Sequence, residues 1–105
     1  MMKNYINCGN ASEAEAKVVF NFFNQYELEN DLPGEIRTDY YGSVEEMLDS
    51  FNYQHRDGFG RYRVYHYELY IREYNYETET RGGWVKVEGG YSQAYYRMMS
   101  EPVVR

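Results

Sequence analysis

His66 and Glu68 come nearest, by type and spacing, to a catalytic or metal-binding pair. They lie two positions apart in a segment that alternates like a β-strand, so their side chains share one face. An imidazole beside a carboxylate can bind a metal ion or transfer a proton. A metal site needs more ligands, and the chain has only two histidines and one cysteine. We therefore favour a polar pair on a solvated sheet.

The other candidates for chemistry are also better explained without it. His55 lies at an expected turn, where a solvated or capping role is typical. Cys8 has no neighbour that marks an activated thiol, and a buried strand cysteine is inert. The acidic pairs lie where charges usually face water, at Glu45/Glu46 and Glu77/Glu79. We expect no enzymatic activity, no cofactor and no metal.

Charge and tyrosine are distributed unevenly along the 105 residues, whose net charge is −6. Residues 1–50 carry a net charge of −7, whereas residues 51–105 carry +1 and hold ten of the fourteen tyrosines. Tyrosine offers a large, rigid contact area with a polar tip and is enriched at interfaces. This pattern favours a protein that works by binding another macromolecule.

Length and composition predict one domain over residues 1–105. With 43% hydrophobic residues the chain is too apolar to be disordered. Its single cysteine, Cys8, allows no internal disulfide. No apolar run has the length of a signal peptide or a membrane span, so we expect a cytoplasmic protein with no membrane partner.

A first helix is predicted between a capping box at residues 12–15 and Tyr26. Ser12 and Glu15 have the spacing of a capping box. Apolar residues then recur at the spacing of one helical face, at Val18, Val19, Phe22, Phe23 and Tyr26. Residues 28–42 are predicted to be a connection, because Pro33-Gly34 is a turn signal.

A second helix is predicted over about 44–54. Ser43 and Glu46 repeat the capping-box spacing, and a second apolar stripe follows as far as Phe51. Asp57-Gly58 is then expected to end the helical part of the chain.

From Arg61 the hydrophobic period changes to two, which predicts strands. One face would carry Tyr65, Tyr67, Leu69 and Ile71. We predict a hairpin turn at 81–83, a return strand over 84–88 and, in preference to a strand, a short helix over 92–99. The expected fold is α+β, with two N-terminal helices packed on a C-terminal antiparallel β-meander whose other face is open for binding.

The leading hypothesis is a small acidic protein that binds a basic partner. Carboxylates spaced over a folded surface can imitate a phosphate backbone and occupy the basic groove of a nuclease or a nucleic-acid-binding protein. Tyrosines can fill pockets at the centre of such a contact. The expected contact residues are Glu27, Glu29, Asp31, Glu35, Asp39, Tyr40, Tyr41, Glu45, Glu46, Asp49, Tyr70, Tyr74 and Tyr76.

In size, acidity and cysteine content the chain resembles phage-encoded inhibitors of bacterial defence, including anti-CRISPR and antirestriction proteins. The stretch Asp39-Tyr40-Tyr41-Gly42, which leads into an acidic helix, also resembles the ribonuclease inhibitor barstar. These resemblances imply an inhibitor in the host cytoplasm, with DNA mimicry as one mechanism. They supply no correspondence between individual residues.

Two alternatives stay open. A single-stranded nucleic acid could lie on the sheet, with bases on Tyr62, Tyr70, Tyr74 or Tyr76 and phosphates on Arg61, Arg63 and Arg72. Gly58-Phe59-Gly60 matches part of the aromatic motif of RNA-recognition domains, but the register is broken, and a net charge of −6 opposes direct nucleic-acid binding. The other alternative is an assembly subunit that pairs with a neighbour, or with a second copy as a homodimer, through its tyrosines.

Overall fold

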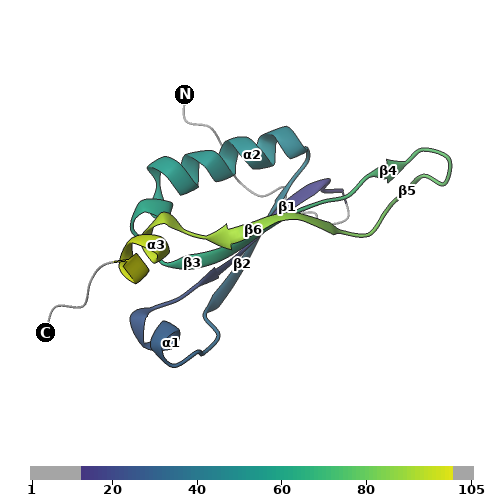
Figure 1. Cartoon of the computed structure of the whole chain (residues 1–105). Helices are drawn as coiled ribbons and strands as arrows, with labels where there is room; N and C mark the ends of the chain where they lie inside the picture. The colour runs from purple at the N-terminus through teal and green to yellow at the C-terminus, as the bar shows by residue number, and fades with distance from the viewer. Residues whose placement is uncertain (1–12, 101–105) are drawn as a thin grey trace, which may run out of the picture.

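The computed structural model describes residues 13–100, which form one four-stranded antiparallel sheet, a two-stranded arm and three α-helices (Figure 1). The elements run in the order β1 (Ala16–Phe22), α1 (Gln25–Glu29), β2 (Glu35–Tyr41), α2 (Val44–Asn52), β3 (Tyr65–Ile71), β4 (Tyr74–Asn75), β5 (Thr80–Arg81), β6 (Val85–Tyr91) and α3 (Gln93–Ser100). Between α2 and β3 lie a π-helical turn, η1 (Tyr53–Asp57), and a 3₁₀ turn, η2 (Phe59–Arg61).

The sheet has the order β2-β1-β3-β6, so β1 is flanked on both sides. In the register of this sheet, Ala16 lies between Tyr41 and Ile71, and Phe22 lies between Glu35 and Tyr65. Because β2 and β3 are both antiparallel to β1, they run parallel to each other, and the connection through α2 must cross the sheet. That crossing lays α2 over one face, as Figure 1 shows.

The core lies between α2 and the inner face of the sheet. Every second residue of β1 is buried there, and α2 contributes Met47 and Phe51. Phe20 is at the centre, with ring centroids 5.5 Å from Phe59 and 5.4 Å from Tyr65. These edge-to-face contacts explain why the aromatic residues, and not aliphatic ones, supply most of the packing.

The predicted arrangement of two N-terminal helices on a C-terminal meander is wrong. The mixture of helices and strands is present, but strands come first: the segment predicted as the first helix is β1. Its burial alternates strictly, and valine and phenylalanine favour a flanked strand. Val18 and Phe22 fit a helical period as well as a period of two, and that ambiguity misled the prediction. Ser12 and Cys8 lie outside the described residues.

The predicted connection over 28–42 is also wrong, because it contains β2. Its strand pattern was hidden by charge on the inner face. The guanidinium of Arg37 donates to the carboxylate of Asp39, with Nη2 to Oδ2 at 2.7 Å, and lies 5.0 Å from the Phe20 ring centroid. Arg37 and Asp39 occupy inward positions of β2 that apolar residues usually fill. Because both are charged, the alternation typical of a strand is not visible in the sequence.

Later elements agree better with the sequence. The second helix is confirmed as α2, and Ser43 caps it by accepting a hydrogen bond from the Glu46 amide. Part of the strand predicted from Arg61 is confirmed as β3, with Tyr65 and Leu69 buried, but Arg61 itself belongs to η2. The helix predicted over 92–99 is confirmed as α3. The predicted turn at 81–83 is wrong: the reversal lies between β4 and β5, where Glu79 has φ 56°.

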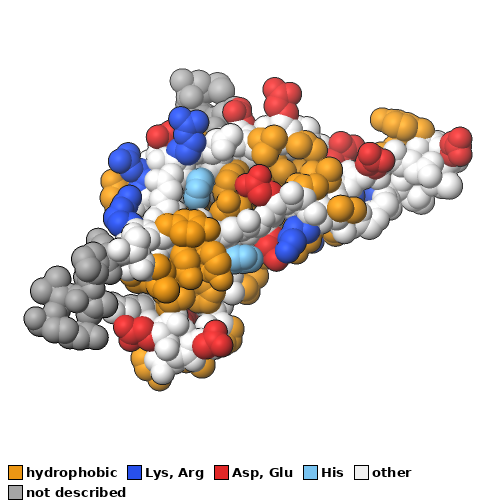
Figure 2. All heavy atoms as spheres, in the orientation of Figure 1, with side chains coloured by type: hydrophobic (Ala, Val, Ile, Leu, Met, Phe, Trp, Pro, Cys, Tyr) orange, Lys and Arg blue, Asp and Glu red, His pale blue; other side chains and the backbone are white. Residues whose placement is uncertain are grey.

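Two features distinguish the outer surface. The arm formed by β4 and β5 projects beyond the main sheet (Figure 1). In Figure 2 hydrophobic side chains form a patch over α3, and basic side chains gather over the turns that follow α2. None of the helices within residues 13–100 is long and apolar enough to cross a bilayer.

Candidate functional site

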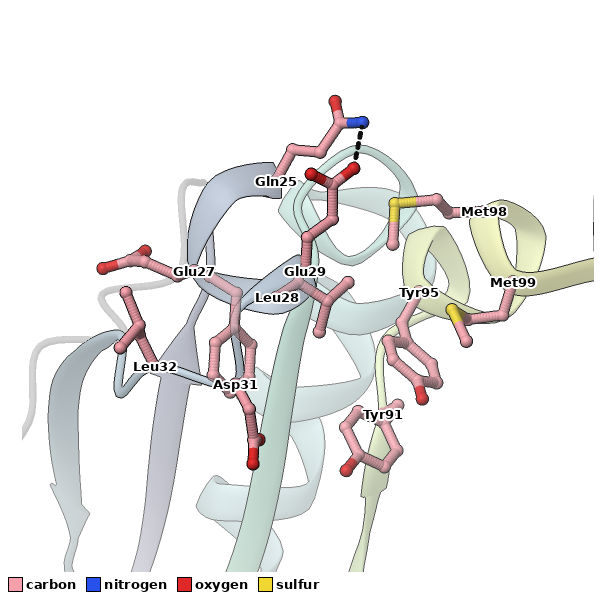
Figure 3. Close-up of a pocket in the computed structure, with 11 residues that line it drawn as sticks. Gln25, Glu27, Leu28, Glu29, Asp31, Leu32, Tyr91, Tyr95, Met98 and Met99 are labelled. Atoms are coloured by element: carbon pink, nitrogen blue, oxygen red, sulfur yellow. Dashed lines mark hydrogen bonds between the residues drawn. The ribbon is translucent and has the colours of Figure 1, made fainter. Parts of the chain in front are cut away.

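A groove of about 510 Å³ opens between α1 with its following loop and α3 (Figure 3). This volume is within the range of ligand-binding sites, roughly 300–1,000 Å³. Its walls are largely apolar, with side chains from Phe23, Leu28, Leu32, Tyr91, Tyr95, Met98 and Met99. The amide of Gln25 and three carboxylates, from Glu27, Glu29 and Asp31, complete the lining. The groove therefore combines an apolar surface with negative charge.

Local capping fixes the α1 side of the groove. Asn24 accepts a hydrogen bond from the Glu27 amide at 2.7 Å, and the Glu27 carboxylate accepts one from the Asn24 amide at 2.9 Å. This reciprocal capping box stabilises a helix of only five residues and holds Glu27 in place. Asp31 then turns the chain with φ 55°, a left-handed conformation that aspartate tolerates better than most residues.

Ser92 fixes the α3 side. It is fully buried, and its hydroxyl accepts hydrogen bonds from the amides of Tyr65 and Tyr95 while donating to the Arg63 carbonyl. The ring of Tyr95 stacks on Tyr91, with centroids 3.9 Å apart. Tyr95, Met98 and Met99 follow one another at helical spacing, so α3 presents them together, facing α1 in Figure 3.

The negative charge of the groove is not neutralised locally. Glu29 accepts a hydrogen bond from the side-chain amide of Gln25 at 3.0 Å, which is a neutral donor. Within residues 13–100 no ion pair joins Glu27, Glu29 or Asp31 to a lysine or an arginine. No basic residue contributes to the lining. A cation that entered the groove would find three carboxylates without competing bases.

The predicted contact residues thus include three that line the groove, Glu27, Glu29 and Asp31, whose carboxylates point in different directions in Figure 3. Glu35 is exposed at the same end of the sheet, paired in register with Phe22. The remaining predicted acids lie elsewhere.

Glu45, Glu46 and Asp49 are exposed on α2, which starts beyond the far end of β2. A strand of seven residues is roughly 20 Å long, so this second acidic group lies well away from the groove. The carboxylates over 27–49 therefore form two separate groups, and they do not line up into one phosphate-like surface.

Asp39 and Tyr41 were predicted contacts, but both are buried, with 6% and 3% of their surfaces exposed. The Tyr41 hydroxyl is 2.8 Å from the hydroxyl of Ser50, and burial raises the pKa of Tyr41. Both residues point to the inner face of β2, opposite to the side chain of Tyr40 between them. They stabilise the core and offer nothing to a partner.

The predicted tyrosines also separate. Tyr40 and Tyr70 lie on the open face of the sheet, where the Lys17 ammonium is 4.9 Å from the Tyr70 ring and 4.6 Å from the Trp84 ring. Burial and the neighbouring Arg72 lower the pKa of Lys17. Tyr74 and Tyr76 are on the arm, where their rings pack against each other 4.8 Å apart. None of the four lines the groove.

His66 and Glu68 share the open face of β3, as the alternation predicts, but Glu68 is engaged by other groups. It accepts a hydrogen bond from Tyr70 at 2.8 Å, and Lys86 Nζ lies 3.5 Å from its other oxygen. The hydrogen bond from Tyr70 is the main cause of the lowered pKa of Glu68. Across residues 13–100 no three His, Cys, Asp or Glu side chains are grouped as metal ligands.

Sequence reasoning missed the apolar part of the groove. Asn24 and Glu27 have the spacing of a capping box, but the predicted helix ran through them and concealed that signal. Tyr95, Met98 and Met99 were predicted to be helical without a role for their shared face. The signals in the sequence were the capping-box spacing for the α1 wall and the helical spacing of Tyr95, Met98 and Met99 for the α3 wall.

No family model, no curated protein and no solved structure matches this chain.

Proposed function

We propose that this protein is a binding module that captures a basic segment of a partner protein in the groove between α1 and α3. The occupant would be a segment in which lysine or arginine side chains flank apolar ones. Its apolar side chains would contact Leu28, Met98 and Met99, while its cations would face Glu27, Glu29 and Asp31. Binding, and not catalysis, is the proposed activity.

The observation that carries this proposal is the coincidence of exposed apolar side chains with carboxylates that form no ion pair within residues 13–100. Met99 is 61% exposed, and exposed large apolar groups beside a groove mark interaction sites. Methionine is flexible and polarizable, so it adapts to differently shaped partners. The carboxylates add selection for positive charge and faster association, because electrostatic complementarity acts mainly on encounter and specificity.

An inhibitory role follows from the class of partner. Nucleases and nucleic-acid-binding proteins carry lysine and arginine where they contact phosphates. A module that occupies such a segment would block nucleic acid from it, which would make this protein an inhibitor of the phage anti-defence type. The contact would be a groove holding a segment, and not an extended DNA-like surface. We also propose a cytoplasmic setting, in keeping with one cysteine in 105 residues.

A fluorescein-labelled amphipathic peptide of lysine and leucine provides the test probe, and its anisotropy gives the Kd at low salt. The triple variant Glu27→Gln, Glu29→Gln, Asp31→Asn removes charge but keeps the cap and the turn, because Gln can close a capping box and Asn accepts the left-handed conformation. We expect the Kd to rise by about tenfold. The pair Met98→Gln and Met99→Gln should weaken binding by a similar factor.

The matched control removes three charges from the arm, as Glu73→Gln, Glu77→Gln and Glu79→Gln. It changes the net charge equally and should leave the Kd within about twofold. An equal loss of affinity in the arm variant would show that overall charge causes the effect, and it would refute the groove as the binding site. A loss confined to Glu45→Gln, Glu46→Gln and Asp49→Asn would move the contact to α2 and also contradict the proposal.

A further inference from the structure

Four arginines that are distant in sequence lie on or beside η1, η2 and α3, three elements that contact one another. They are Arg56 in η1, Arg61 at the end of η2, Arg63 just after it and Arg97 in α3. All four are exposed. We call this set the arginine cluster. Its concentration of positive charge is unexpected in a chain with a net charge of −6.

Backbone contacts hold the cluster together. A Cβ on Gly60 would overlap the carbonyl of His55, so η1 and η2 touch at this glycine. The Arg97 guanidinium donates to the Arg61 carbonyl at 2.9 Å, and the Gln93 side chain donates to the His55 carbonyl at 3.0 Å. These bonds join α3 to both turns. The four arginines are thus carried on one rigid unit.

The guanidiniums remain available for a ligand. Within residues 13–100 no ion pair joins any of them to a carboxylate. The guanidinium carbon of Arg63 lies 4.1 Å from the centroid of the Phe22 ring, a contact that helps to position the guanidinium. Asp57 is the acidic residue closest in sequence and leaves a local excess of positive charge. Such groups bind phosphates through paired N–H donors.

Tyr62 adds a stacking surface between two of the arginines. It is 77% exposed, and its ring makes no aromatic contact within the described part of the chain. A large exposed ring flanked by arginines suits an unpaired base, whose face is accessible only when the nucleic acid is single-stranded. The turn that carries it offers no helix or strand to enter a duplex groove.

We infer that the arginine cluster with Tyr62 is a binding site for single-stranded nucleic acid, with phosphates on the arginines and a base on Tyr62. This site shares Tyr62, Arg61 and Arg63 with the predicted nucleic-acid site on the sheet, but it uses the turns after α2, together with α3, in place of the sheet face. On that face Lys17 already covers the Tyr70 and Trp84 rings. The inference is independent of the groove. It concerns other residues and a ligand of opposite charge.

The test measures the anisotropy of labelled oligothymidylate and oligouridylate, each of about twelve nucleotides, from about 50 to 200 mM salt. Arg56→Gln with Arg61→Gln should weaken binding by about tenfold and reduce the salt slope by roughly 1.4, since each phosphate contact on a single strand contributes about 0.7. Tyr62→Leu should weaken binding by about tenfold, whereas Tyr62→Phe should restore it. The two oligomers distinguish DNA from RNA as the ligand.

The matched control is Arg81→Gln with Lys86→Gln, which removes two positive charges from the arm and β6 and should leave the affinity within about twofold. Three results would overturn the inference. The first is no binding at low salt, or binding that the cluster variants leave unchanged. The second is tighter binding of a duplex of the same length. The third is tighter binding of a doubly phosphorylated peptide than of either oligomer.

Discussion

Arg97 of the arginine cluster and the groove residues Tyr95 and Met99 project from opposite sides of α3. One turn of an α-helix takes 3.6 residues, so Arg97 points about 160° away from both Tyr95 and Met99. The groove contains three carboxylates and no base in its lining, while the cluster contains four arginines that make no ion pair within residues 13–100. A single short helix therefore separates two surfaces of opposite charge.

The two regions also differ in what holds them in place. The groove depends on side-chain caps at helix ends, from Asn24 to α1 and from Ser92 to α3. The arginine cluster depends on a backbone contact at Gly60 and on bonds from α3 to carbonyls of η1 and η2. Asn24 on the groove side and Gly60 on the cluster side can therefore be substituted to disrupt the two surfaces separately.

Phe20→Ala should reduce stability more than any other variant and should weaken the groove and the arginine cluster alike. Phe20 is 1% exposed and packs against Phe59 and Tyr65, so its removal leaves a large cavity. We expect the free energy of unfolding to fall by about 3–5 kcal/mol, measured by urea denaturation. Ile36→Ala, on the exposed part of β2, should change it by about 0.5 kcal/mol or less. Equal effects of the two variants would refute the described core.

Gly60→Ala should disrupt the arginine cluster and spare the groove. The new methyl group would overlap the His55 carbonyl and force η1 and η2 apart. We expect a loss of about 1–3 kcal/mol in unfolding free energy, together with weaker oligothymidylate binding and unchanged peptide binding. Gly83→Ala is the control, because a Cβ there meets nothing within 4 Å. If Gly60→Ala weakened peptide binding and left oligothymidylate binding unchanged, Gly60 would support the groove and not the arginine cluster.

Asn24→Ala should do the reverse. It removes the side-chain acceptor of the capping box, so α1 should lose about 1 kcal/mol. Peptide affinity should then fall because Glu27 and Leu28 are less well fixed, and oligothymidylate affinity should not change. Asn24→Ser keeps a capping oxygen and should retain most of the affinity for the peptide. If Asn24→Ala bound the peptide as well as the wild type, α1 would not be a wall of the binding site.

A smaller effect is expected from pH. Burial lowers the pKa of His55, whose Nδ1 lies 3.0 Å from the Tyr65 hydroxyl and whose ring stacks on Phe51. Between the ordinary pKa and the lowered one, the unfolded chain binds more protons at this residue than the folded chain. The contribution of His55 to the free energy of unfolding is therefore complete above about pH 6.5, where the residue is neutral in both states, and it decreases as the pH falls below that value.

The measurement is urea unfolding of wild type and His55→Gln from about pH 7.5 to 5.5. The variant should be less stable throughout and should lose less stability on acidification. Because His55 anchors η1, oligothymidylate binding should also respond to its substitution, while peptide binding should not. Parallel pH profiles for the two proteins would contradict the assignment.

The parts of the fold that sequence predicts well are those in which one signal dominates. Ser43 and Ser92 precede helices that exist, and the alternation around Leu69 marks a strand that exists. The errors fall where two physical effects compete. Val18 and Phe22 satisfy both periods, and only the pairing of β1 with two neighbouring strands decides for the strand.

The candidate site was predictable in part for the same reasons. Glu27, Glu29 and Asp31 were predicted as contacts among the other acids of residues 27–49, and they are close enough in sequence to line one groove. Asp39 has the same residue type but faces inward to Arg37, which only the register of β2 reveals. The arginine cluster joins residues 56 and 97, and no local pattern predicts a contact between such distant segments.

The central claim is that the acid-rimmed groove holds a basic segment, and an NMR titration of the ¹⁵N-labelled protein with the lysine–leucine peptide tests it most directly. The amide signals of α1, its loop and residues 91–99 should shift in proportion to occupancy, while those of α2 and the open sheet face stay in place. Shifts confined to α2 or to the face of Tyr40 and Tyr70, with the groove signals unmoved, would contradict the claim.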